Sequence, residues 1–186
     1  MDTLVIGAGV VGLSIGTALA RRGANVIVAE QSDQIGSGIS SRNSEVIHGG
    51  MYYPQGSLKA RCCVEGRRRL YSYCHTRGVR HAKLGKLIVA TSPAEEGKLA
   101  AIHAQGKENG VESLELLSGS TAIAMEPALS CFAALWSPMT GILDSHSLML
   151  ALQGEIEDAS GSIAFLTEVR RLRRAREGLL RNKAGL

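Results

Sequence analysis

The start of the chain alternates between short apolar runs and a stretch with helical spacing. Residues 3–6 form an apolar run that predicts a strand, and a glycine-rich turn follows it. Residues 10–22 predict a helix, which Gly23 would end because glycine readily adopts the left-handed conformation of many helix ends. Residues 25–29 predict a second strand that leads into Glu30. The pattern therefore predicts a strand–helix–strand unit of an α/β fold.

The remaining chain continues to alternate predicted helices and strands. A polar, glycine-rich segment over residues 31–42 leads to a predicted helix at 58–75. Further strands are predicted at residues 86–90, 114–117, 131–137 and 163–169, and further helices at 93–109, 118–125 and 145–160. We interpret this order as a nucleotide-binding domain that an insertion interrupts. Its parts are residues 1–78 as the first part, 79–141 as a partial substrate domain, 142–169 as the return to the first domain, and 170–186 as a basic tail.

The glycines after the first strand have the spacing of a dinucleotide phosphate clamp. Gly7 permits a tight turn, Gly9 lets the backbone approach a pyrophosphate, and Gly12 lets the helix pack closely on the strand. The helix N-terminus presents unpaired N–H groups to the phosphates, and Glu30 is placed to accept hydrogen bonds from ribose hydroxyls. The predicted cofactor-binding residues here are Gly7, Ala8, Gly9, Val11, Gly12, Glu30 and Gln31.

The segment after Glu30 distinguishes between the dinucleotides. A nicotinamide enzyme would continue with alternating strands and helices, whereas this chain continues with small polar residues. Hydroxyl and amide side chains suit a second contact with an extended pyrophosphate–ribityl chain, although the same residues are common in a plain loop. The predicted contacts in this segment are Ser40, Ser41, Arg42, Asn43 and Ser44.

The clamp and the run from Ser40 to Pro54, with its His48-Gly49-Gly50-Met51-Tyr52-Tyr53 core, resemble the FAD-dependent oxidoreductases of the D-amino-acid-oxidase type. Within that family the chain looks most like the L-2-hydroxyglutarate oxidases and dehydrogenases. Three later stretches, at residues 83–91, 125–127 and 137–146, fit the same subfamily. The resemblance implies a Rossmann-like FAD-binding domain of the GR2 type, interrupted by a partial α+β substrate domain.

The resemblance also implies a reaction. A hydride would pass from the α-carbon of a small 2-hydroxy acid to FAD, and the electrons would go on to oxygen or to a quinone. His48 would lie beside the flavin ring, where it would polarise the flavin, help deprotonate the substrate hydroxyl or attach the flavin covalently; a structural histidine is the alternative. Tyr52 and Tyr53 would hold the substrate carboxylate, or they would be packing aromatics. Val169 matches a position that contacts adenine through its backbone, with a plain core valine as the alternative.

Charge and composition restrict the partners. The net charge of +4 is concentrated after residue 169, where six arginines and one lysine face one glutamate. A solvated chain end explains this excess of positive charge better than nucleic-acid binding does. We expect at most peripheral association with a membrane. Cys62, Cys63, Cys74 and Cys131 have no metal-ligand spacing, so we expect no metal and mostly buried, reduced thiols. No transmembrane run is present and the first strand starts at residue 3, from which we expect a cytoplasmic protein.

Members of the resembled family are longer than this chain, and their second half completes the substrate domain and carries basic residues for the substrate. We therefore expect an N-terminal fragment of such an enzyme. Two alternatives stay open: a non-catalytic dinucleotide-binding fragment, and an amino-acid oxidase of the same fold family.

Overall fold

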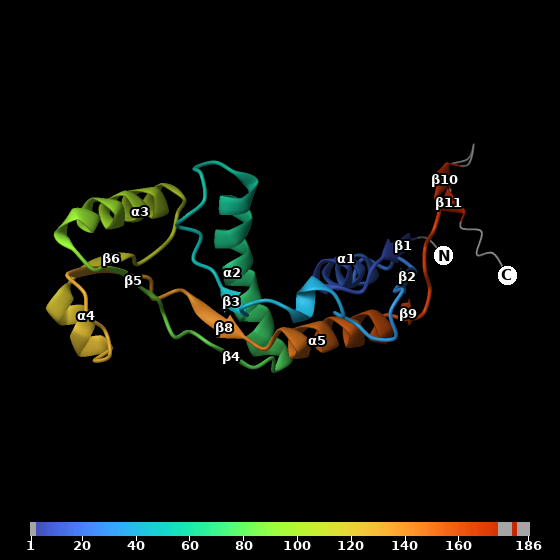
Figure 1. The fold of residues 1–186 in the computed structure, drawn as a ribbon. Helices are drawn as coiled ribbons and strands as arrows, with labels where there is room; N and C mark the ends of the chain where they lie inside the picture. Colours follow the sequence, from blue (N-terminus) through green and yellow to red (C-terminus); the bar gives the residue numbers. More distant parts are fainter. Residues whose placement is uncertain (1–2, 175–179, 182–186) are drawn as a thin grey trace. The chain divides into compact units, whose positions relative to one another are not determined.

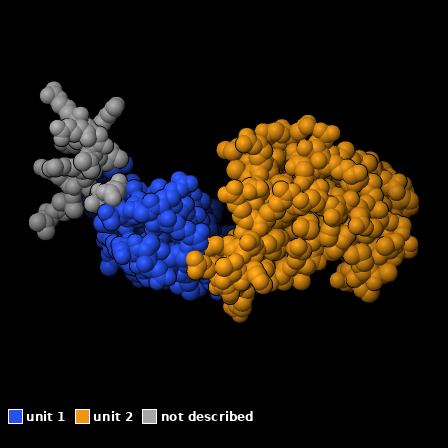
Figure 2. All heavy atoms as spheres, turned by 180° about the vertical axis from the view of Figure 1, so that it is seen from behind, with its two compact units in different colours: residues 1–44, 145–186 blue, residues 45–144 orange. Residues whose placement is uncertain are grey.

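The structure is a computed structural model, and it describes residues 3–174 and 180–181. The chain divides into two compact units, which Figure 2 shows in different colours. Unit 1 combines Met1–Ser44 with Ser145–Leu186, and unit 2 is the continuous segment Glu45–Asp144. Within the described residues no helix is both long enough and apolar enough to cross a bilayer.

Unit 1 is built on a parallel sheet with the strand order β1-β2-β9 (Figure 1). The register aligns Thr3 with Val26, and Ile27 with Ser162. Helices α1 and α5 connect the strands, as parallel pairing requires crossover connections. The elements of this unit are β1 (Thr3–Ile6), α1 (Val10–Ala20), β2 (Val26–Ala29), a 3-10 turn (Ile39–Ser41), α5 (Ser145–Asp158) and β9 (Ser162–Ala164).

Close packing of α1 on α5 forms the core of unit 1. The buried residues of α1 are Leu13, Gly16, Thr17 and Ala20, which share one face at helical spacing. A Cβ on Gly16 would lie 2.9 Å from Ile156 Cδ1, so the absence of a side chain lets the two helices approach. The Thr17 hydroxyl donates to the Leu152 carbonyl over 3.0 Å, which satisfies a buried polar group.

The last strand of unit 1 is shorter than the sequence pattern predicts. β9 ends at Ala164 rather than at residue 169. Leu166 has φ 52°, and the N–H groups of Leu166 and Thr167 donate to the carbonyls of Ser32 and Glu30. The chain therefore turns back over the end of β2, and Val169 lies beyond the strand.

Unit 2 contains two antiparallel sheets and the long helix α2. The strand orders are β3-β8-β4 and β5-β7-β6. The elements are β3 (Val46–Ile47), α2 (Leu58–Arg77), β4 (His81–Ala82), β5 (Leu87–Ala90), a 3-10 turn (Pro93–Glu95), α3 (Glu96–Glu108), β6 (Glu115–Ser118), α4 (Gly119–Met125), β7 (Ala133–Trp136) and β8 (Gly141–Leu143). Helix α2 begins where the Ser57 hydroxyl accepts from the Ala60 N–H, and it ends at Gly78 with φ 66°.

The core of unit 2 includes a residue from the loop before α2. Met51 is 1% exposed and belongs to a buried apolar cluster with Val64, Ala90, Leu99, Val111, Leu114 and Leu135. These residues come from the loop before α2, from α2 and α3, from strands β5 and β7, and from the segment between α3 and β6, which supplies Val111 and Leu114. Burial of Met51 therefore fixes the segment that carries His48 and Tyr52.

The division into units differs from the predicted boundaries at 78/79 and 141/142. Residues 45–78 belong to unit 2 because β3 pairs with β8 and α2 packs within that unit. The three short strands β3, β4 and β8 were not anticipated. Of the cysteines only Cys74 is buried, whereas Cys62 is exposed and Cys63 and Cys131 are intermediate, so the expectation of mostly buried thiols was wrong.

The basic tail contains a short antiparallel pair. β10 (Arg173–Arg174) pairs with β11 (Leu180–Arg181), with Arg173 opposite Arg181. Residues 175–179 and 182–186 of the predicted tail lie outside the described residues.

Candidate functional site

The glycine turn in unit 1 leaves no room for side chains at its tightest positions. Gly7 has φ 94°, and a Cβ on Gly12 would lie 1.9 Å from the Gly7 carbonyl oxygen, so neither position accepts a side chain without distortion. Gly9 caps α1 without a side-chain hydrogen bond, and the first turn contains no acidic residue. The positive end of the helix dipole therefore lies at a position suited to phosphate, although the Val10 N–H is taken by the Ser40 hydroxyl.

Glu30 follows β2 and locks the glycine turn against it. Its carboxylate is largely buried and accepts from the Ala8 N–H at 2.7 Å and from the Ser32 N–H at 2.9 Å. Burial alone would raise the pKa of this carboxyl, but the backbone hydrogen bonds outweigh burial and lower the pKa. The group is therefore ionised at neutral pH, and each oxygen keeps a lone pair for a ribose hydroxyl.

The small polar segment reaches the same helix end through Ser40. The Ser40 hydroxyl oxygen accepts from the Val10 N–H at 3.1 Å, and a Cβ on Gly9 would lie 3.0 Å from it. Asn43 donates to the Ser40 carbonyl and the Ser41 hydroxyl donates to the Gly38 carbonyl, so these side chains order the turn. Ser41, Arg42, Asn43 and Ser44 are exposed, as is Gln31.

A hollow of about 550 Å³ lies beside the turn, lined by Gly7, Gly9, Gly12 and Ser40 together with apolar groups. Val11 is among the apolar groups and is 68% exposed. Backbone donors, a helix end without an acidic neighbour, and an ionised carboxylate fit the adenosine-diphosphate half of FAD. Val169 is half-buried beyond β9, and its predicted backbone contact with adenine stays a prediction.

The second group of predicted residues, His48, Tyr52 and Tyr53, lies in unit 2. His48 follows β3 and is an exposed residue, but partial burial of its imidazole is the largest cause that lowers its pKa. The positive charges of Lys86 and Lys59 lower it further. At neutral pH the imidazole is therefore uncharged and available to accept a proton.

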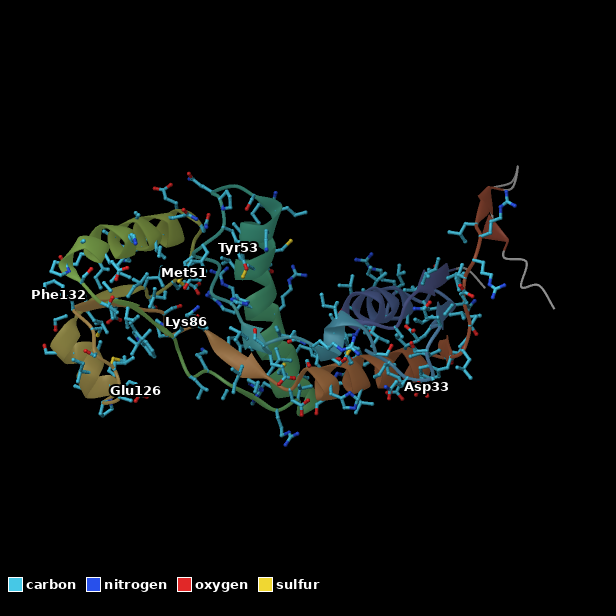
Figure 3. The ribbon with its side chains drawn as sticks, in the orientation of Figure 1. Asp33, Met51, Tyr53, Lys86, Glu126 and Phe132 are labelled. Atoms are coloured by element: carbon cyan, nitrogen blue, oxygen red, sulfur yellow. The ribbon has the colours of Figure 1, made fainter. Side chains whose placement is uncertain are left out.

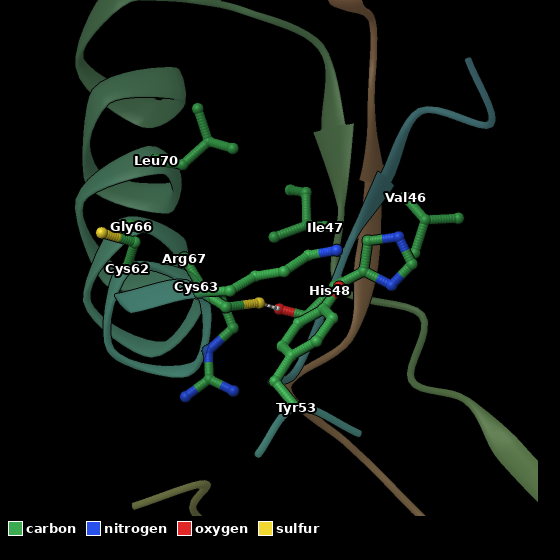
Figure 4. A pocket seen from close by; sticks show the side chains of 10 residues that line it. Val46, Ile47, His48, Tyr53, Cys62, Cys63, Gly66, Arg67 and Leu70 are labelled. Carbon is green, nitrogen blue, oxygen red and sulfur yellow. Dashed lines mark hydrogen bonds between the residues drawn. The ribbon is translucent and has the colours of Figure 1, made fainter. Parts of the chain in front are cut away.

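His48 lines a cavity of about 360 Å³, which Figure 4 shows from close by. The Cys63 thiol donates to the His48 carbonyl across 3.3 Å. The lining residues come from β3, from the loop after it and from α2: Val46, Ile47, His48, Tyr53, Lys59, Cys62, Cys63, Gly66, Arg67 and Leu70. Tyr53 thus shares a cavity with His48, whereas Tyr52 is not among the lining residues.

Arg67 supports the loop that carries His48. It is 2% exposed, and it donates to the Gly49 carbonyl at 3.2 Å and to Glu112 at 2.9 Å. Its Nε–H finds no acceptor within the part of the chain that the structure describes. Gly49 is buried and Gly50 has φ 104°, so the pair of glycines lets the backbone turn sharply between His48 and Met51.

Two lysines lie over the two tyrosines. The Lys59 ammonium is 4.6 Å from the Tyr53 ring centroid, and the Lys86 ammonium is 5.0 Å from that of Tyr52. Figure 3 labels Tyr53, Met51 and Lys86 in this part of unit 2. The sequence reasoning missed Lys59, Lys86 and Arg67. The available signal for Lys59 was its place in the first turn of the helix that starts just after the tyrosines.

A family comparison matches almost the whole chain. The profile of the family described as FAD dependent oxidoreductase covers residues 2–185. Among solved structures, an FAD-bound L-α-glycerophosphate oxidase from Mycoplasma pneumoniae has a TM-score of 0.91 at 24% identity, covering 99% of this chain and 50% of that one. A glycine oxidase from Geobacillus kaustophilus has a TM-score of 0.82 at 25% identity, covering 92% of this chain and 48% of that one. The predicted fold class and FAD cofactor are confirmed.

Curated relatives are more similar in sequence. The mitochondrial L-2-hydroxyglutarate dehydrogenase of Arabidopsis thaliana is 51% identical over 152 residues, which are 82% of this chain and 32% of that protein. The human mitochondrial enzyme of the same name is 34% identical over 187 residues, covering 100% of this chain and 40% of that protein. The chain therefore spans less than half of the length of either relative.

The predicted cytoplasmic location is contradicted by these relatives, which are named as mitochondrial. The prediction rested on a strand that starts at residue 3. Where a chain spans part of its relatives, the position of its first strand carries no information about the segments that precede it in a longer protein.

Proposed function

The chain belongs to the FAD dependent oxidoreductase family, and from this premise we propose that it is part of an enzyme that oxidises a small 2-hydroxy acid, namely L-2-hydroxyglutarate to 2-oxoglutarate. The observation that carries the proposal is the identity with the Arabidopsis dehydrogenase, which covers most of this chain. His48, whose pKa is lowered, lines a cavity together with Lys59, and a base beside a cation suits a substrate that carries a carboxylate.

The chain's own residues divide the work between the units. In unit 1 the turn from Gly7 to Gly12 would hold the pyrophosphate of FAD, and Glu30 would hold the ribose. When bound, FAD supplies the acceptor for a hydride. In unit 2 His48 takes the hydroxyl proton of the substrate on its imidazole, while the hydrogen on the α-carbon leaves with its electron pair. A new carbon–oxygen double bond forms at that carbon.

The electron acceptor and the location complete the proposal. We expect oxygen or a quinone to reoxidise the flavin, with at most peripheral membrane association. The names of the relatives favour a mitochondrial location.

A non-catalytic dinucleotide-binding fragment is the second candidate. The specific observation in its favour is that the chain spans 32% of the Arabidopsis protein and 40% of the human one. Substrate contacts supplied by the rest of those proteins are outside this sequence. An amino-acid oxidase is the third candidate, supported by the structural likeness to glycine oxidase.

Anaerobic spectroscopy of the purified chain separates the candidates. After incubation with FAD and removal of free flavin, the chain should keep flavin absorbance bands that bleach with L-2-hydroxyglutarate. His48→Asn should slow bleaching by about 100-fold, because a positioned general base contributes at least that much. The matched control His75→Asn alters an exposed histidine near the end of α2 and should bleach normally.

Other outcomes would overturn the proposal in defined ways. Flavin bands that persist with L-2-hydroxyglutarate indicate the non-catalytic fragment. Bands that persist with the hydroxy acid and bleach with glycine or sarcosine indicate an amino-acid oxidase.

A further inference from the structure

The loop from His48 to Tyr53 runs between β3 and α2, outside the two sheets of unit 2. Its carbonyl groups are bound by side chains instead of a neighbouring strand. The Cys63 thiol donates to the His48 carbonyl, and Arg67 donates to the Gly49 carbonyl. Because a buried carbonyl without a donor is unfavourable, these side chains determine which path the loop follows.

Two further carbonyls of the loop are bound from the end of α3. The Asn109 side-chain amide donates to the Gly50 carbonyl at 3.1 Å and to the Tyr53 carbonyl at 2.8 Å. Gln105, one turn earlier on the same helix, donates to the Tyr53 carbonyl at 2.7 Å. A carbonyl oxygen accepts two hydrogen bonds, so these two amides together saturate the Tyr53 carbonyl.

Helix α3 approaches the loop closely because a glycine faces it. A Cβ on Gly106 would lie 3.1 Å from the Cβ of Met51. Met51 is buried in the core of unit 2, and in the sequence it stands between the two residues whose carbonyls Asn109 binds. The contact between α3 and the loop therefore combines apolar packing at Met51 with hydrogen bonds on both sides of it.

The side chain of Asn109 is oriented toward the loop at a cost. Its Oδ1 is buried, and no group of residues 3–174 or 180–181 donates to it. A buried acceptor without a donor is unfavourable, and a residue that only ended a helix would have no reason to keep one. Both N–H bonds of the amide, by contrast, are directed at loop carbonyls. The orientation therefore indicates that Asn109 serves the loop.

We propose that Asn109, assisted by Gln105, is a positioning residue for the oxidation proposed above, and that it holds the loop so that His48 and Tyr53 stay on the wall of one cavity. This deepens the proposed function and rests on it, because the position of His48 matters to a reaction only if His48 acts on a substrate. His48 and Tyr53 both line the cavity, and α3 supplies none of its lining residues. The helix therefore acts through the loop. Small displacements of a reacting group slow a reaction strongly, so a loop held at several carbonyls favours catalysis.

Cys63 provides a reporter of the loop that needs no substrate. Gly50 packs against this residue, since a Cβ on Gly50 would lie 3.7 Å from the Cys63 Sγ. Cys63 is half-buried, whereas Cys74 on the same helix is fully buried. Alkylation of Cys63 therefore measures local opening of the loop, and alkylation of Cys74 measures unfolding of α2.

The test compares the wild-type 186-residue chain with Asn109→Leu, which removes the amide at similar size. Asn109 has φ −77°, so leucine introduces no backbone strain there. Iodoacetamide labelling is followed at each cysteine by peptide mass spectrometry. Labelling of Cys63 should become about tenfold faster, because a net hydrogen bond is worth up to about that factor, and labelling of Cys74 should stay unchanged.

Two further measurements connect the loop with the reaction. In NMR spectra of Asn109→Leu the carbonyl carbon signals of Gly50 and Tyr53 should move, and the imidazole signals of His48 should move with them. In the flavin-loaded variant the limiting rate of bleaching by L-2-hydroxyglutarate should fall about tenfold while the flavin content is retained. The substrate concentration that gives half of the limiting rate should change less than the limiting rate itself.

Matched variants separate hydrogen bonding from side-chain size. Lys107→Leu places the same side chain at an exposed position of the same helical turn and should change none of these quantities. Gln105→Met removes one of the two donors to the Tyr53 carbonyl and should accelerate Cys63 labelling by only about threefold. Asn109→Gln keeps the amide and should recover most of the wild-type labelling and bleaching rates.

Three results would overturn the inference: unchanged Cys63 labelling in Asn109→Leu, equal acceleration at Cys63 and Cys74, and equal effects of Asn109→Leu and Asn109→Gln. If the wild-type chain bleaches and Asn109→Leu bleaches at the same limiting rate, the positioning role is wrong while the proposed function stands. If the Cys63 labelling and the His48 signals respond but the wild-type chain does not bleach, Asn109 does position His48 and the proposed function fails.

Discussion

The glycine turn of unit 1 and the cavity beside His48 in unit 2 are built from different parts of their residues. The turn consists of backbone: positive φ at Gly7, an open helix end at Gly9, and no space for a Cβ at Gly12. The cavity consists of side chains, among them His48 and Arg67, which different elements bring together. Figure 1 shows that β1 and α1 follow one another in the chain. The cavity of unit 2 is lined by residues of β3, of the loop after it and of α2.

The two sites are therefore sensitive to different kinds of substitution. A backbone site fails when a side chain is added, because the added atoms occupy the space of the turn or of the ligand. A side-chain site fails when a group is removed, because a buried partner is left without its hydrogen bond. Substitutions of opposite kind therefore test the two regions.

The largest effect is expected from adding one methyl group to the turn. Gly12→Ala places a Cβ at 1.9 Å from the Gly7 oxygen, so the strand and helix must separate. We expect a loss of about 3 kcal/mol in the free energy of unfolding, at the upper end for overpacking, and loss of FAD binding. Urea unfolding by circular dichroism and flavin fluorescence quenching measure the two.

Gly154→Ala is the control for the turn, since a Cβ there meets nothing within 4 Å and the residue is in α5. It should stabilise the chain by about 0.5–1 kcal/mol. If Gly12→Ala behaved in the same way, the turn would not depend on close backbone packing.

Removal of a buried cation should have the next largest effect. Arg67→Met takes the donor from the Gly49 carbonyl and leaves Glu112 with Arg68 as its remaining arginine partner, and we expect a loss of about 2 kcal/mol because the buried Gly49 acceptor stays unpaired. The NMR signals of His48 should move, since Arg67 holds the adjacent glycine. Arg69→Met, whose ion pair with Glu65 is exposed, should cost at most about 0.5 kcal/mol. Equal effects would mean that Arg67 does not support the loop.

The smallest effect of the three is expected at Glu30, where a side chain serves the backbone site. Its pKa is lowered from 4.5 in the folded chain, so the carboxylate stabilises the fold above that pH, and the stabilisation is lost as the pH falls through the folded pKa. Glu30→Gln should cost about 1.5 kcal/mol at pH 7 and less at acidic pH, in urea unfolding at a series of pH values. Glu157→Gln, an exposed change on α5, should alter neither value appreciably. If the loss of unfolding free energy in Glu30→Gln did not change with pH, the size and packing of the side chain would matter rather than its charge.

How much the sequence could predict follows from the same contrast. A glycine in a sequence marks a position where the backbone can adopt conformations closed to other residues. The spacing of the glycines and of Glu30 therefore predicted the turn from Gly7 to Gly12 and the placement of Glu30 after the second strand. Helix α2 was predicted over 58–75 and observed over Leu58–Arg77, because its ends carry a serine cap and a glycine stop. Local signals of this kind survive without knowledge of the tertiary structure.

The features that sequence reasoning missed depend on contacts between distant residues. β3 and β4 are two residues long, so no period could reveal them, and they exist because β8 pairs with both. Lys59 resembles an ordinary solvated lysine in the sequence, and only the fold places it in the cavity that His48 also lines. The strand predicted to reach residue 169 ended at Ala164 because the chain turns back toward Ser32 and Glu30.

The division of unit 1 into two chain segments has a kinetic consequence. The pairing of β2 with β9 requires closure of a loop that contains all of unit 2, and closing about 100 flexible residues costs about 4 kcal/mol of chain entropy. In unit 2 the Leu143 N–H donates to the Glu45 carbonyl over 3.0 Å, so its folding brings its own two ends together. Prior folding of unit 2 would thus shorten the effective loop between β2 and β9 and lower the entropy cost of pairing them. We expect unit 1 to be the last part of the chain to gain protection from hydrogen exchange.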